Sequence, residues 1–196
     1  MNFFKKLFSS GKENEPKEQE VNVNSIYSDT YFNERYTEQD LKNDPVLLDG
    51  CIKMIEGFFI ANKVERKVEN PVNHPVNLDQ TIDEGFGFRM YCKAFQFGDA
   101  QTGMFLAYAF SGFLINNYGF KLYKDNKPEF PLRSMTLKYD KDGTVLSLYP
   151  FEYSLKVLNY ESTFEELHNR IDAQLKSMPR VEDLLKNITG GKEDSS

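Results

Sequence analysis

Three carboxylates stand close together in the sequence, at Asp79, Asp83 and Glu84. Residues three and four apart lie on one side of a helix, so a helix that starts near Asp79 would group them. Paired carboxylates can act as general acid and base, or bind a divalent cation. Either chemistry needs a histidine or a further acid in register, and the surrounding sequence offers neither. The pattern therefore favours the ordinary role of acids at a helix start, where they stabilise the helix dipole.

A second group of acids surrounds the start of another predicted helix, where Thr163 is followed three residues later by Glu166 in a capping-box pattern. No chemistry is assembled around either acidic group. We therefore predict that the acids contribute to a surface for a basic partner. The predicted partner-binding residues are Asp79, Asp83, Glu84, Glu161, Glu165 and Glu166.

The two histidines, His74 and His168, fall in separate predicted elements, a proline-containing loop and the capped helix. This separation predicts structural or solvated histidines. Cys51 and Cys92 have no neighbouring cysteine or histidine at metal-ligand spacing. Their apolar helical surroundings predict small buried side chains. Free thiols suit a reducing compartment, so we expect a cytoplasmic protein.

Two glycine patterns approach nucleotide-binding motifs without completing them. The Gly-Phe-Gly at residues 85–87 has Met90 where a dinucleotide fingerprint needs its third glycine. Gly98 and Gly103 have the spacing of a phosphate loop, but the required Lys and Ser or Thr do not follow. We therefore expect no cofactor.

The charge balance decides between classes of macromolecular partner. Acids outnumber bases 30 to 24, and the formal charge is −6. Duplex nucleic acid is bound through clustered Lys and Arg, and no basic run here exceeds two residues. Nucleic acid is thereby excluded, and a basic protein such as a toxin is the favoured partner. The longest apolar stretch, 104–115, is shorter than the roughly 20 residues that cross a bilayer, so we expect no stable membrane insertion.

Composition divides the chain into three parts. Residues 1–24 are predicted to be a flexible tail and linker, because residues 9–24 have almost no apolar side chain. Residues 25–190 hold enough apolar residues for one domain. Residues 191–196 are predicted to be a disordered polar tail.

Apolar periodicity predicts the elements of this domain. Helices are predicted at 45–62, at 79–97, and at 100–118 between Asp99 as cap and Gly119 as terminator. The third of these is apolar on almost every side, so we expect it to be the central, buried helix.

Alternating residues predict strands at 120–123, 135–139 and 144–149, the last two joined by a hairpin turn at 140–143. A further strand is predicted at 153–158, before the helix that follows Thr163. The predicted fold class is α+β, with a helical first half, an antiparallel sheet with a hairpin, and a C-terminal amphipathic helix packed on the sheet.

From Gly98 to Met178 the predicted order is helix, strand, hairpin and capped helix, with Tyr149-Pro150-Phe151 and Ser154-Leu155-Lys156 after the hairpin. This layout resembles small uncharacterised bacterial domains of the immunity-protein kind. The resemblance carries over no functional residue. It implies a non-enzymatic protein-binding module, such as an immunity-type inhibitor of a cognate bacterial toxin.

The alternative is a small-ligand-binding or enzymatic domain with a pocket between helices and sheet. A deep cavity that holds Asp83, Glu84 or His168 would favour this alternative.

Overall fold

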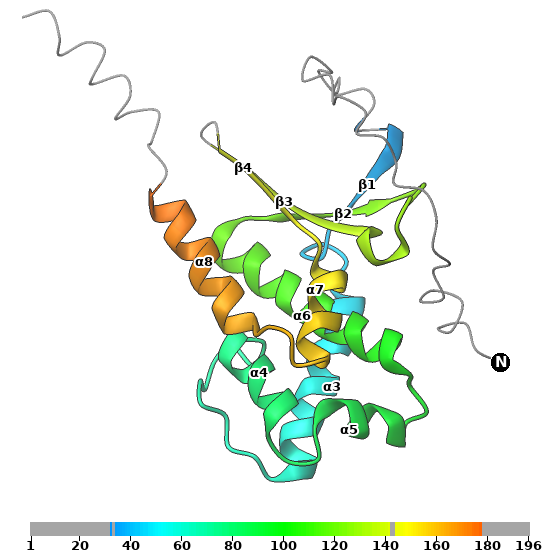
Figure 1. Cartoon of the computed structure of the whole chain (residues 1–196), viewed down its shortest axis with the longest axis vertical. Helices are drawn as coiled ribbons and strands as arrows, with labels where there is room; N and C mark the ends of the chain where they lie inside the picture. Colours follow the sequence, from blue (N-terminus) through cyan, green and yellow to red (C-terminus); the bar gives the residue numbers. More distant parts are fainter. Residues whose placement is uncertain (1–31, 33, 142–143, 178–196) are drawn as a thin grey trace, which may run out of the picture.

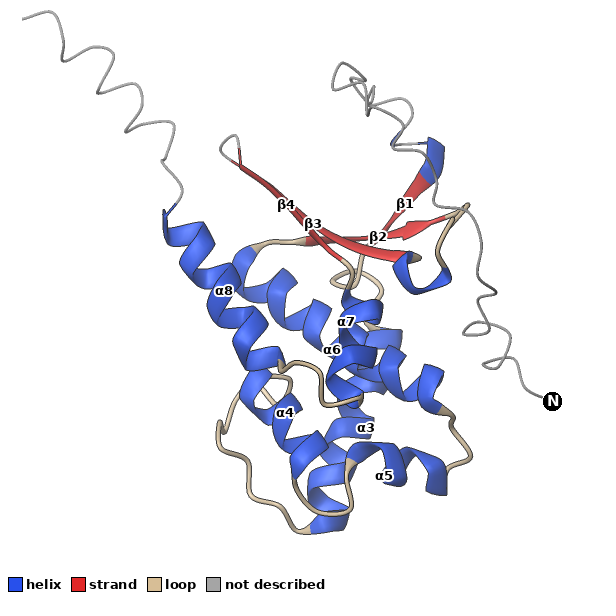
Figure 2. Ribbon diagram, viewed as in Figure 1, coloured by secondary structure: helices blue, strands red, loops and turns tan. Residues whose placement is uncertain are grey.

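The computed structural model of the chain describes residues 32, 34–141 and 144–177. Helices gather on one side of a four-stranded antiparallel sheet, and the two layers share one apolar core (Figures 1 and 2). The predicted α+β fold class is confirmed. The predicted tails at 1–24 and 191–196 lie outside the described residues.

The chain runs from strand β1 through helices α3 to α6, then through the other three strands, and then into helices α7 and α8. The described helices are α3 (Val46–Asn62), α4 (Pro75–Asp83), α5 (Phe88–Ala94), α6 (Asp99–Tyr118), α7 (Pro150–Leu158) and α8 (Phe164–Ser177), with a short 3-10 helix at Pro131–Arg133. The described strands are β1 (Tyr36–Gln39), β2 (Lys121–Asp125), β3 (Met135–Lys141) and β4 (Thr144–Leu148), which lie in that order across the sheet.

Helix α6 is the central element, as its apolar sequence predicts, and it packs against α3, α4, α5, α7 and β2. Small residues allow these close approaches. A Cβ on Gly103 would lie 2.8 Å from a methyl carbon of Leu155 on α7. The helix begins one residue earlier than predicted, with Gly98 as the N-cap and Asp99 in the first turn. It ends as predicted at Gly119, whose φ of 75° is left-handed and suits glycine.

The predicted helix at 79–97 is wrong in its extent, because the structure divides it into α4 and α5. Gly85 and Gly87 between them have φ values of 62° and 75°, which a continuous right-handed helix cannot contain. Helix α4 also begins earlier than predicted, at Pro75. Proline is accommodated there because the first helical residue needs no N–H partner.

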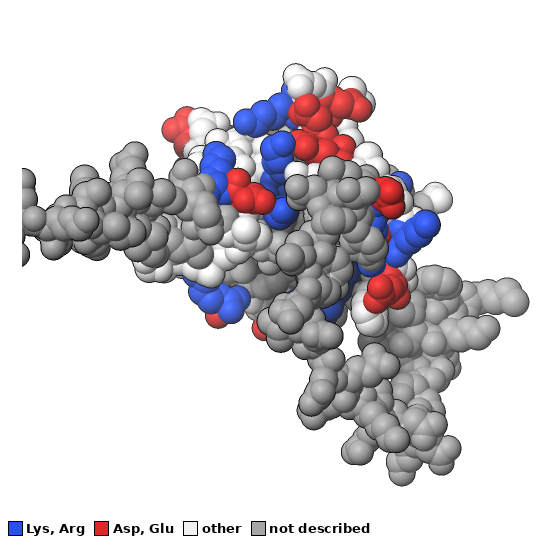
Figure 3. Space-filling view, turned by 90° about the horizontal axis from the view of Figure 1, so that it is seen from above, with Lys and Arg blue, Asp and Glu red and all other residues white. Residues whose placement is uncertain are grey.

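One face of the sheet packs on the helices. Leu122, Leu137 and Leu148 are register neighbours on β2, β3 and β4, and they belong to the core or pack against it. Alternation along the strands turns Tyr123 to the other face, where Phe32 meets its ring edge-on at 5.1 Å. Figure 3 looks at the molecule from the sheet side and shows basic and acidic side chains interspersed there.

Strand β1 is an element that the sequence did not predict, because its residues are largely polar. It pairs antiparallel with β2, with Tyr36 opposite Asp125. Asp125 is buried, and Nη2 of Arg35 donates to its Oδ2 at 2.9 Å. This ion pair fixes the start of β1 against the end of β2.

The predicted strand at 153–158 is wrong, because these residues belong to helix α7. Pro150 stands in the first turn of the helix, where its fixed φ favours a helix start. Phe151, Ser154, Val157 and Leu158 are buried at helical spacing. A short apolar run does not distinguish strand from helix by periodicity alone.

Helix α8 follows Thr163, as predicted, and its Phe164 and Ile171 are buried. Its most extensive contact is with α4, and the ring of Phe164 also meets Phe110 of α6 with 5.0 Å between centroids. Helices α4 and α8, far apart in the sequence, therefore lie side by side (Figure 1).

Candidate functional site

Acids from two distant segments meet at a cavity of about 220 Å³. Asp79 and Asp83 reach it from α4, and Glu161 reaches it from the connection between α7 and α8. The remaining lining residues are Ile82, Val157, Tyr160, Ser162 and Thr163. We call this space the acidic cavity.

Asp79 has a structural role as well as a place in the acidic cavity. Its Oδ1 accepts the backbone N–H of Phe164 at 2.8 Å, and its Oδ2 accepts that of Glu165 at 2.9 Å. It thus supplies acceptors for two of the N–H groups that the start of α8 leaves without helical partners. The sequence predicted that this acid would stabilise its own helix, whereas the structure shows it capping another one.

The Asp79 carboxyl lies in an environment that disfavours its charge. Burial raises its pKa from 3.8 to about 6, and the two N–H groups that it accepts act in the opposite direction. The nearby carboxylates of Asp83 and Glu165 raise the pKa further. A cation in the cavity would favour the charged carboxylate and so would oppose the effects of burial and of the neighbouring carboxylates.

The other two acids of the cavity are exposed. Neither the Asp83 nor the Glu161 carboxylate makes an ion pair or side-chain hydrogen bond with another residue that the structure describes. Both groups are therefore free to bind a charge from outside.

The three remaining predicted acids do not line the acidic cavity. Glu84 accepts a hydrogen bond from Gln80 at 3.3 Å and forms an ion pair with Lys67 at 3.2 Å. Glu165 and Glu166 are exposed on the first turn of α8. The backbone N–H of Glu166 donates to Oγ1 of Thr163 at 3.1 Å, which confirms the predicted threonine cap.

The two histidines, predicted to lie in separate elements, are neighbours in the fold. The ring centroids of His74 and His168 are 5.9 Å apart, and Phe113 meets each ring edge-on at 5.2 Å. Nδ1 of His74 accepts the N–H of Val76 and so caps α4. The hydroxyl of Tyr118 lies 2.7 Å from Nε2 of His168.

The histidine environment favours neutral rings. Burial lowers the pKa of His74, and the nearby His168 lowers it further. Burial also lowers the pKa of His168, against the opposing effect of Asp172 and Glu165. Each ring thus has packing and hydrogen-bonding contacts that account for a structural role.

Cys51 and Cys92 are buried, as predicted, and both are free thiols. Burial raises the pKa of Cys51 to about 12 and that of Cys92 to about 11. Neither side chain therefore offers a thiolate near neutral pH, and thiolate is the nucleophilic form. Within the described residues, no three His, Cys, Asp or Glu side chains are grouped so that they could hold a metal ion.

No helix in the described part of the chain is long and apolar enough to cross a membrane. Comparisons with protein-family profiles, with curated proteins and with solved structures each found no match to this chain.

Proposed function

We propose that this protein is a non-enzymatic binding module that takes a Lys or Arg side chain of a protein partner into the acidic cavity. The observation that carries this proposal is the convergence of Asp79, Asp83 and Glu161 around one cavity. Two of these carboxylates are exposed and lack an ion-pair partner among the described residues. The third is half-buried, with a raised pKa.

The size and the wall of the cavity suit a single basic side chain. A volume of about 220 Å³ is below the range of roughly 300–1,000 Å³ that is typical of drug-sized ligands. Tyr160 at its edge is 71% exposed. Its φ of 62° is the left-handed conformation that ends α7, where the N–H of Glu161 donates to the carbonyl of Lys156 at 2.9 Å. The ring can stack on a guanidinium or on the aliphatic stem of a lysine.

Within this class, we propose an immunity-type inhibitor that acts in the cytoplasm on a basic bacterial toxin. The support is the layout of the segment from Gly98 to Met178, the net charge of −6, and the two free thiols. An acidic inhibitor would approach a basic toxin under long-range attraction, which raises the rate of association.

The test begins with a partner captured from the native host and then purified. Its affinity is measured for the wild type and for the double variant Asp83→Lys, Glu161→Lys. The matched control is Asp44→Lys, Glu69→Lys, which changes the net charge equally at exposed acids outside the cavity.

We expect the cavity variant to bind at least about tenfold more weakly than the control, because a repelled charge costs more than about 1.4 kcal/mol at close contact. Equal affinities for the two variants would contradict the proposal.

A further inference from the structure

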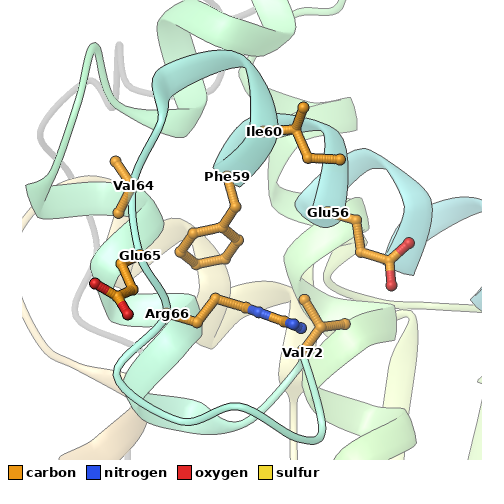
Figure 4. A pocket seen from close by; sticks show the side chains of 7 residues that line it. All are labelled: Glu56, Phe59, Ile60, Val64, Glu65, Arg66 and Val72. Carbon is orange, nitrogen blue, oxygen red and sulfur yellow. The ribbon is translucent and has the colours of Figure 1, made fainter.

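A second and larger cavity, of about 410 Å³, lies between α3 and the segment 63–74 that follows it (Figure 4). Its lining residues are Glu56, Phe59, Ile60, Val64, Glu65, Arg66 and Val72. We call it the Arg66 cavity. No residue lines both this cavity and the acidic cavity, so the inference drawn from it does not depend on the proposed function.

The Arg66 cavity combines apolar walls with one cation. Phe59 and Val72 are almost fully buried, and Ile60 at the rim is 78% exposed. In Figure 4 the Arg66 side chain runs below the Phe59 ring, and its guanidinium ends beside Val72. An apolar body can therefore pack here while a charged group reaches the guanidinium.

Arg66 is half-buried and makes no ion pair or side-chain hydrogen bond with another residue in the described part of the chain. The other described arginines all have such a partner; they are Arg35, Arg89, Arg133 and Arg170. Glu56 and Glu65 line the same cavity, yet neither forms an ion pair with Arg66. The guanidinium thus has its hydrogen-bond donors available to a ligand.

The backbone on both sides of Arg66 is held by one buried amide, that of Gln80 on α4. Oε1 of Gln80 accepts the N–H of Lys67 at 2.8 Å, and its Nε2 donates to the carbonyl of Glu65 at 3.0 Å. Gln80 is only 2% exposed. Because both neighbours are fixed, Arg66 is presented from a rigid backbone.

A second buried amide fixes the far side of the segment. Nδ2 of Asn77 donates to the carbonyl of Val68 at 2.7 Å and to that of Val72 at 3.3 Å, while Oδ1 accepts the N–H of Val68 at 3.0 Å. These bonds between the protein's own groups hold one wall of the cavity in place. A preformed site loses less free energy to ordering when it binds.

We propose that the Arg66 cavity binds an apolar group that carries a single carboxylate. The guanidinium is suited to a carboxylate, which it can bind with two parallel hydrogen bonds. The volume falls within the range of small-molecule sites. Glu56 and Glu65 at the cavity disfavour ligands with several negative charges, such as phosphates. The same chemistry occurs in a free aryl or aliphatic acid and in the apolar C-terminus of a peptide.

The test uses the full chain labelled for NMR, with two acids as probes. One is 4-phenylbutyrate, and the other is an N-acetylated dipeptide ending in phenylalanine with a free carboxylate. Each acid is compared with its neutral amide. We expect the acids to shift the backbone signals of residues 56–72, and each amide to bind at least about tenfold more weakly, because a charge-assisted bidentate contact is lost.

The variant Arg66→Gln should reduce the affinity for the acids by a similar factor. The control Lys67→Gln removes the same charge one residue later, from a side chain that pairs with Glu84 outside the cavity, and should change the affinity less than about twofold. If the dipeptide binds more tightly, the ligand of the Arg66 cavity is a peptide C-terminus. If phenylbutyrate binds more tightly, the ligand is a free acid. Equal binding means that the cavity recognises the carboxylate with its apolar group, whichever molecule carries it. Amides that bind as tightly as the acids, an Arg66→Gln variant with wild-type affinity, or unchanged spectra at millimolar concentration would each overturn the proposal.

Discussion

Oδ1 of Asp79 accepts the backbone N–H of Phe164 at 2.8 Å, across a separation of 85 residues in the sequence. A side chain of α4 thus shares the capping of α8 with Thr163. The same contact closes one wall of the acidic cavity, because Asp79 lines it together with Glu161 of the α7–α8 connection. The geometry of the proposed partner site therefore depends on the packing of these two helices.

Replacement of Asp79 by Ala should lower the free energy of unfolding at neutral pH by about 1 kcal/mol, within the range of roughly 0.5–2 kcal/mol for lost N-caps. Two N–H groups at the start of α8 lose their acceptor. The loss of an unfavourable buried charge offsets part of the cost. Urea denaturation gives the difference between wild type and variant.

The control is Asp83→Ala, one turn along the same helix, where the carboxylate has no partner among the described residues. It should change stability by less than about 0.5 kcal/mol. Equal effects of the two substitutions would contradict the capping role of Asp79.

The raised pKa of Asp79 predicts a particular pH dependence. The folded state holds its proton more tightly than the unfolded chain, whose pKa is 3.8, so the proton stabilises the fold at low pH. This contribution is fully present below pH 3.8 and is lost as the pH rises through about 6. The stability of the wild type relative to Asp79→Asn should therefore fall across this interval and stay constant above it.

The measurement is the free energy of unfolding of both proteins at several pH values. Groups that titrate identically in the two proteins, including the histidines, cancel in the difference. A difference that does not vary with pH would show that the Asp79 carboxyl is not perturbed.

The two histidines should make the stability of the protein depend on pH in the opposite direction to Asp79. Burial lowers the pKa of His74 and of His168, so protonation favours the unfolded chain, whose histidine pKa is 6.5. Stability should fall as the pH drops through 6.5, and the loss should end below the lowered folded-state values. The double variant His74→Asn, His168→Gln should show a smaller loss across this range, because neither replacement titrates.

The sequence predicted the long helices correctly because their apolar patterns are long. Helix α3 lies within one residue of its predicted bounds, and α6 occupies the predicted centre of the core. The predicted helix at 79–97 was wrong in its extent, and two shorter elements were missed or misassigned. β1 is polar and is defined by its pairing with β2, which follows it by more than eighty residues. The nine-residue run of α7 is too short for its period to be decisive.

The sequence identified the acids of the candidate site, but it did not indicate how they are arranged in space. Asp79, Asp83 and Glu161 were chosen for their charge, yet their convergence arises from the packing of α4 against α8, which no local pattern encodes. The Arg66 cavity had no sequence signal of its own. Its walls depend on the buried amides of Asn77 and Gln80, and buried amides cannot be told from exposed ones by residue type.

The proposed partner interaction should depend on salt through the acidic cavity. Exposed carboxylates attract a basic partner over about 30 Å at roughly 0.01 M ionic strength, and screening shortens this reach to about 8 Å at physiological ionic strength. The on-rate of the wild type should therefore fall as salt rises, while the off-rate changes less. The double variant Asp83→Lys, Glu161→Lys should associate more slowly at low salt and show a shallower salt dependence.

The control pair Asp44→Lys, Glu69→Lys separates local from global charge, because it changes the net charge by the same amount at exposed positions outside the cavity. If the acidic cavity is the binding site, the control should retain most of the wild-type salt dependence, since the local field at the contact is intact. Stopped-flow kinetics with the purified partner at low and high salt provide all the rates required. On-rates that fall equally for the cavity variant and the control would mean that only the net charge of the protein steers association. Asp83 and Glu161 would then contribute no more to recognition than the exposed acids that the control replaces.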